Sequence, residues 1–172
     1  MQQKKICMLG AFAVGKTSLV RRYVDSIFSE TYLTTVGVKI DKRVVTLDDE
    51  TVNLILWDIA GEDDVSSVRM SYLRGASGYF VVIDGTRAAT LDVARSIQQR
   101  AEQEIGTVPF IALVNKLDLR NEWSVAEEQL AALRDAGWSV TLTSARTGEG
   151  VEEAFRVLAE RIVPPSRATC RS

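Results

Sequence analysis

The sequence predicts an α/β fold: a doubly wound, mostly parallel sheet of six strands with one antiparallel edge strand. Strand-like and helix-like segments alternate along the chain without an internal repeat or a linker, which is typical of this class. Two strand-like segments are joined only by the short turn Asp48-Asp49-Glu50, which predicts a hairpin and therefore the antiparallel edge. Because such sheets bind ligands at the carboxyl ends of their strands, we expect site residues where apolar strands end.

Strands are expected where short runs are apolar or alternate in polarity. The runs at 79–83 and 110–114 are continuously apolar, as is typical of central strands that are buried on both faces. The six predicted strands span residues 6–9, 36–47, 52–57, 79–83, 110–114 and 138–142.

Helices are expected where apolar residues recur three or four positions apart. The first begins at about Gly15. The pattern Ser124-x-x-Glu127 predicts a capping box that opens the third, which ends at Gly137. The fourth ends before Pro164-Pro165. The apolar stripes of the four helices are Leu19, Val20, Tyr23, Val24 and Ile27; Ala94, Ile97, Ala101 and Ile105; Leu130 and Leu133; and Val151, Ala154, Phe155, Leu158 and Ile162.

Length and composition limit the classes of protein that fit. The 172 residues, 46% hydrophobic and 26% charged, predict one globular domain over residues 1–163 and a short flexible tail over 164–172. A net charge of −2 gives no field that favours nucleic acid, and the absence of histidine excludes His-based triads and the common zinc sites. The sequence has no apolar run long enough to span a membrane and no signal peptide. We expect Cys7 to be buried and Cys170 to lie in the tail, with no disulfide between them, and therefore expect a cytoplasmic protein.

The segment from Gly10 to Thr17 matches the pattern G-x-x-x-x-G-K-[ST] and lies between a predicted strand and a predicted helix. In such a loop, backbone N–H groups and the positive end of the helix dipole bind a polyphosphate. Lys16 would bind the outer phosphates, and the Thr17 hydroxyl would bind Mg²⁺. The alternative interpretation is a tight strand–helix turn with a solvated lysine.

Three further predicted strands end in polar residues. Asp58 follows the strand at 52–57, where a carboxylate is costly in a core but suits Mg²⁺. The last two strands end in Asn115-Lys116-Leu117-Asp118 and Thr143-Ser144-Ala145-Arg146. Each could be an ordinary polar strand end, but together with the loop they predict one nucleotide site.

With these motifs, residues 4–163 resemble a Ras-superfamily small GTPase, a P-loop NTPase G domain, and the detail is closest to the Rab branch. The resemblance implies that the chain binds GTP and GDP with Mg²⁺ and hydrolyses GTP to GDP and phosphate. It also implies a molecular switch that works through switch I (about 28–37) and switch II (about 60–75). Asp118 would select guanine, because its carboxylate accepts two N–H groups that adenine cannot supply.

The resemblance also assigns roles by position. The implied catalytic residues are Lys16, Thr35, Gly61 and Glu62, and the implied Mg²⁺ ligands are Thr17, Thr35 and, through water, Asp58. The implied nucleotide-binding residues are Gly10, Ala13, Val14, Gly15, Lys16, Thr17, Ser18, Phe28, Thr35, Gly61, Asn115, Lys116, Asp118, Leu119, Ser144, Ala145 and Arg146. Ile40, Trp57 and Tyr72 occupy positions like the hydrophobic trio through which Rabs bind effectors; the alternative is that they are ordinary core or rim residues.

Two residues depart from the family pattern. Glu62 holds the position of the water-orienting glutamine, and electrostatics oppose the close approach of a carboxylate to a negative γ-phosphate. Phe12 holds a loop position that is usually glycine, where its ring should crowd an arginine finger supplied in trans. We therefore expect slow intrinsic hydrolysis. The alternative is a non-hydrolysing guanine-nucleotide-binding module, and Asn115-Lys116-x-Asp118 argues against a third option, an ATP-dependent kinase or ATPase.

The C-terminus predicts no intrinsic membrane anchor. A prenylation box needs three residues after its cysteine, and Cys170 is followed by two. Gln2 stands where myristoylation requires glycine. The short, unlipidated form fits the Ras-like GTPases found in bacteria.

Overall fold

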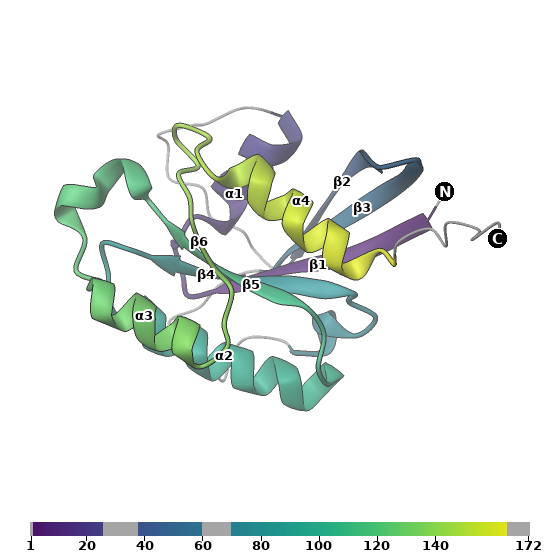
Figure 1. Cartoon of the computed structure of the whole chain (residues 1–172). Helices are drawn as coiled ribbons and strands as arrows, with labels where there is room; N and C mark the ends of the chain where they lie inside the picture. The colour runs from purple at the N-terminus through teal and green to yellow at the C-terminus, as the bar shows by residue number, and fades with distance from the viewer. Residues whose placement is uncertain (1, 26–37, 60–69, 165–172) are drawn as a thin grey trace, which may run out of the picture.

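The computed structural model describes residues 2–25, 38–59 and 70–164 (Figure 1). In this part of the chain, six strands form one sheet in the order β2-β3-β1-β4-β5-β6. β2 runs antiparallel to β3, and the other neighbouring strands are parallel. The predicted sheet with one antiparallel edge strand is therefore confirmed. The strands are β1 (Gln2–Gly10), β2 (Val38–Leu47), β3 (Glu50–Ile59), β4 (Gly78–Asp84), β5 (Phe110–Asn115) and β6 (Val140–Leu142).

The helices cover both faces of the sheet, α1 and α4 on one and α2 and α3 on the other (Figure 1). Each face of the sheet has its own hydrophobic core, and the side chains of β1 alternate between the two. Ile6 and Met8 pack beneath α1 and α4, and Cys7 and Leu9 pack beneath α2 and α3. The four helices are α1 (Lys16–Asp25), α2 (Ala89–Ile105), α3 (Glu127–Asp135) and α4 (Val151–Ile162), and two 3₁₀ helices are η2 (Met70–Leu73) and η3 (Leu117–Glu122).

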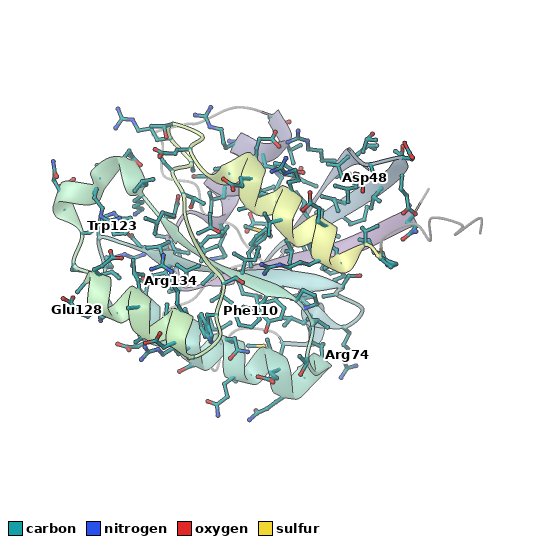
Figure 2. All side chains as sticks on the ribbon, viewed as in Figure 1. Asp48, Arg74, Phe110, Trp123, Glu128 and Arg134 are labelled. Carbon is teal, nitrogen blue, oxygen red and sulfur yellow. The ribbon has the colours of Figure 1, made fainter. Side chains whose placement is uncertain are left out.

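Several strand boundaries differ from the prediction. β6 begins at Val140 rather than Trp138, and β3, β4 and β5 extend one or two residues beyond their apolar runs. β1 begins at Gln2 rather than Ile6, because its polar first residues pair with β3 from Val52 onward. An apolar run marks only the buried part of a strand, whereas backbone pairing sets its length. The hairpin turn is shorter than expected, since Leu47 pairs with Glu50 across two residues. Asp48 adopts φ +51° there and lies at the hairpin tip (Figure 2).

The predicted capping box at Ser124 is wrong. Helix α3 begins at Glu127, and the Gln129 side chain accepts a hydrogen bond of 2.8 Å from the N–H of Ala126. The Ser124 hydroxyl instead accepts from the N–H of Ala88 at 2.8 Å and donates to Thr86 O at 3.0 Å. It therefore fastens the segment before α3 to the loop after β4, a role that local spacing does not reveal.

Cys7 is fully buried, as expected, and burial raises the pKa of its thiol to about 12. Within the three described ranges, we find no helix whose length and apolar character would let it span a bilayer. Cys170 lies outside those ranges.

Candidate nucleotide site

The phosphate loop lies between β1 and α1, and its two motif glycines have close neighbours. A Cβ atom on Gly10 would lie 2.6 Å from Val82 O, and one on Gly15 would lie 2.2 Å from Asn115 Nδ2. Gly15 also has φ +105°, a backbone conformation that residues with a side chain rarely adopt. Glycine at both positions thus lets β4 and the Asn115 side chain approach the loop backbone.

Lys16 is the first residue of α1 and is buried, with 6% of its surface exposed. Its ammonium donates to the carbonyl oxygens of Ala11 at 3.0 Å and Gly10 at 3.3 Å. Burial lowers the pKa of Lys16 to about 8; the Asp58 carboxylate opposes this shift, and the Arg87 guanidinium adds to it. The loop therefore encloses the Lys16 ammonium, which lies near the Asp58 carboxylate and the Arg87 guanidinium.

Thr17 and Asp58 meet beside the loop, where Thr17 Oγ1 donates to Asp58 Oδ2 at 2.5 Å. The prediction that Asp58 follows its strand needs correction, because β3 continues to Ile59 and Asp58 pairs in register with Met8 of β1. Asp58 is fully buried. A hydroxyl and a carboxylate in contact at the base of the loop are hard oxygen donors, the kind that Mg²⁺ prefers.

Asn115, the last residue of β5, connects the phosphate loop to the segment that follows β6. Its Nδ2 donates to Val14 O at 3.1 Å. Its Oδ1 accepts from Thr143 Oγ1 at 3.2 Å and from the N–H of Ala145 at 3.3 Å. With 2% of Asn115 exposed, one buried amide side chain thus holds two distant loops together.

The chain then turns into η3, which carries Asp118 and Leu119. Asp118 Oδ1 accepts a hydrogen bond of 2.7 Å from Ser144 Oγ. Lys116 has φ +71°, and its carbonyl accepts from Nε1 of Trp123, labelled in Figure 2, at 2.8 Å. Ala13 of the phosphate loop has φ +59°. Such conformations cost about 1–3 kcal/mol each and gather at binding sites, which is where both motifs place them.

Sequence reasoning missed Asp84 and Arg87. Asp84, the last residue of β4, is fully buried and accepts a hydrogen bond of 2.7 Å from Lys116 Nζ. Burial raises the pKa of Asp84, but hydrogen bonds from Lys116, Thr86 and Arg87 outweigh burial and lower it. Arg87 also donates to the carbonyl of Phe12 at 2.7 Å. The acid that directly follows the apolar run 79–83 was a usable signal for Asp84, whereas nothing in the sequence singled out Arg87.

Arg22 of α1 is a further residue that the sequence did not indicate. Its Nε donates to Ala145 O at 2.7 Å, and its Nη2 donates to Arg146 O. The carbonyl groups of the predicted base-binding segment are therefore held from the helix that follows the phosphate loop.

The structure brings most of the predicted site residues to one end of the sheet. Contacts join the phosphate loop and α1 to Asp58, Asn115 and, through Arg22, the 144–146 segment. The predicted residues Phe28, Thr35, Gly61 and Glu62, together with switch I and residues 60–69 of switch II, lie outside the described residues.

The three residues of the expected hydrophobic trio lie next to one another. Ile40 pairs in register with Trp57 on the antiparallel β2–β3 pair and is 46% exposed. The rings of Trp57 and Tyr72 have centroids 6.3 Å apart, and Lys5 Nζ lies 3.6 Å from the Trp57 ring centroid. Trp57 and Tyr72 are half-buried. The trio therefore lies at the surface, with Trp57 and Tyr72 packed against the core beneath α2 and α3.

Comparison with known proteins agrees with this geometry. Residues 5–164 match the Ras family. The chain is 36% identical to the Ras-related protein Rab-7L1 of Rattus norvegicus, over 95% of this chain and 83% of that protein. It is 36% identical to Rab-7L1 of Homo sapiens (92% and 82% covered) and 33% identical to Ras-related protein Rab-32 of Homo sapiens (92% and 74%). The bacterial source stays a prediction.

Proposed function

Because this chain belongs to the Ras family, it is a small GTPase that acts as a nucleotide-dependent switch, and we propose which of its residues perform each task. The observation that carries the proposal is the Asn115 side chain, which donates to the Val14 carbonyl at 3.1 Å. That contact fixes the base motif against the phosphate loop, so one nucleotide can occupy both.

The phosphates are bound by the loop. The N–H groups from Ala13 to Thr17 and the N-terminal end of α1 supply partial positive charge, and Lys16 supplies a full one. The Thr17 hydroxyl and the Asp58 carboxylate, in contact at 2.5 Å, fit Mg²⁺, with Thr35 as a further ligand. Mg²⁺ would neutralise charge that develops on the phosphate oxygens during phosphoryl transfer.

Guanine is selected by the second motif. The Asp118 carboxylate accepts the paired N–H groups of the guanine edge, and Ser144 holds that carboxylate through a hydrogen bond of 2.7 Å. Asn115, Lys116, Leu119 and the segment Ser144-Ala145-Arg146 shape the rest of the base pocket, with Phe28 against the ring. A bidentate contact of this kind rejects adenine, since adenine leaves the carboxylate without its second donor.

Hydrolysis is slow in this proposal. Gly61 offers an N–H to the γ-phosphate, and Glu62 orients the attacking water less well than an amide would, because its negative charge is repelled by the phosphate. The Phe12 ring limits access to the same phosphate. An activating protein, if one acts, must approach in a way that this ring allows.

Single-turnover release of phosphate from GTP-loaded protein with Mg²⁺ tests the assignment. We expect bound GDP in the purified protein, slow phosphate release, and faster release in the Glu62→Gln and Phe12→Gly variants. A fast wild type that either substitution slows would refute these roles. GTP retained intact for hours would identify a binding module, and bound adenine nucleotide would refute the role of Asp118.

The trio of exposed Ile40 and half-buried Trp57 and Tyr72 is the proposed effector surface. Lys5 packs its ammonium on the Trp57 ring and so helps to fix the indole. Trp57→Ala should weaken an effector while leaving GTP affinity unchanged, which a pull-down and a nucleotide titration measure together. A parallel loss of both would discredit this surface.

A further inference from the structure

The Asp84 carboxylate accepts hydrogen bonds from two basic side chains, Lys116 of the base motif and Arg87, which contacts the phosphate loop. Its Oδ1 accepts from the N–H and the hydroxyl of Thr86, at 2.9 and 2.7 Å. Its Oδ2 accepts from Lys116 Nζ at 2.7 Å and from Arg87 Nε at 3.0 Å. Since Asp84 is fully buried, both cations are held at a fixed place, the end of β4.

Arg87 extends this cluster to the phosphate loop. While its Nε contacts Asp84, its Nη2 donates to the carbonyl oxygen of Phe12 at 2.7 Å. A guanidinium is a rigid planar fork, so these two contacts together fix the distance between the end of β4 and the loop backbone. A lysine ammonium lacks this planar fork and would not hold the two acceptors in the same relative geometry.

The contact with Phe12 orients a specific loop N–H. The carbonyl of Phe12 and the N–H of Ala13 belong to the same peptide group, which is planar and trans, so the two bonds point in opposite directions. Holding the oxygen toward Arg87 turns the Ala13 N–H away from it. Ala13 has φ +59°, an unfavourable conformation that needs such external support.

We propose that Arg87 is a positioning residue for the β-phosphate, which holds the Phe12–Ala13 peptide so that the Ala13 N–H points into the loop. Through the shared Asp84 carboxylate, Arg87 also links this peptide to Lys116 of the base motif. The inference rests on the proposed phosphate site. Arg87 contacts no nucleotide itself; it acts through the loop backbone.

The test compares GDP with GMP, which lacks the β-phosphate. Dissociation constants of both are measured by competition with a fluorescent guanine nucleotide for wild type, Arg87→Gln and Arg87→Lys, together with thermal unfolding. Arg87→Gln should weaken GDP binding about ten- to a hundredfold, the usual effect of one hydrogen bond to a charged group, and GMP binding less than about threefold. Arg87→Lys should lie between wild type and Arg87→Gln.

Arg43→Gln is a matched control. Arg43 also donates to a backbone carbonyl, that of Tyr23 at 2.6 Å, and pairs with a carboxylate, Glu152 at 2.7 Å, but none of these residues belongs to the nucleotide site. It should lower the unfolding temperature without changing the ratio of the GDP and GMP dissociation constants. Equal losses of GDP and GMP affinity in Arg87→Gln would overturn the inference. A wild type that binds neither nucleotide would instead refute the proposed site.

Discussion

Replacing Asn115 should loosen the contact between the phosphate loop and the segment that follows β6. Asn115→Ala removes the donor to Val14 O and the acceptor of the Thr143 hydroxyl and the Ala145 N–H. At about 1 kcal/mol for each buried hydrogen bond, the free energy of unfolding should fall by roughly 2–4 kcal/mol. Asn115→Asp keeps an acceptor for Thr143 and Ala145 but turns a carboxylate toward Val14 O, so its damage should concentrate in the phosphate loop.

Urea unfolding of nucleotide-free protein, followed by GDP titration, measures both effects. Asn121→Ala is the control, because Asn121 is exposed in η3 and its loss should cost no more than about 0.5 kcal/mol. Asn115→Asp should lose GDP affinity out of proportion to its loss of stability. If Asn115→Ala unfolds with the same free energy as Asn121→Ala, the buried bridge does not hold the loops, and the reasoning fails.

Two further predictions concern the loop and the core. Gly15→Ala should abolish copurification of nucleotide, because its Cβ would lie 2.2 Å from Asn115 Nδ2; Gly106→Ala, with φ +77° and no atom within 4 Å of its Cβ, should retain the nucleotide. Above pH 9 the unfolded Cys7 thiol ionises while the folded one, with a pKa of about 12, does not, so stability should fall by up to about 1.4 kcal/mol per pH unit from this group. Urea unfolding at pH 8, 9 and 10 should give a shallower decline for Cys7→Ala, and equal slopes would refute this cause.

The sequence predicted the sheet because alternation of elements and one short turn leave few topologies open. The same rule, polar residues at the carboxyl ends of strands, found Asp58, Asn115 and Ser144. Local spacing failed at Ser124, whose hydroxyl bonds to backbone 36 and 38 residues away instead of to its own helix. A pattern within four residues cannot report a competing partner that only the fold supplies.

Arg87 illustrates a second limit of sequence reasoning. Its partner in the loop is a main-chain carbonyl, so the residue type at position 12 carries no trace of the contact, and the two residues are 75 positions apart. Because the contact uses the main chain, two unusual features of position 12 are independent: its bulky side chain and the hydrogen bond that its carbonyl accepts from Arg87. In the proposed function the Phe12 side chain limits access to the γ-phosphate, whereas the Phe12 carbonyl, which accepts a hydrogen bond from Arg87, is proposed to orient the Ala13 N–H. The two proposals therefore make hydrolysis and β-phosphate affinity depend on different atoms of one residue. A change of side chain at position 12 should alter the first while the contact that supports the second persists.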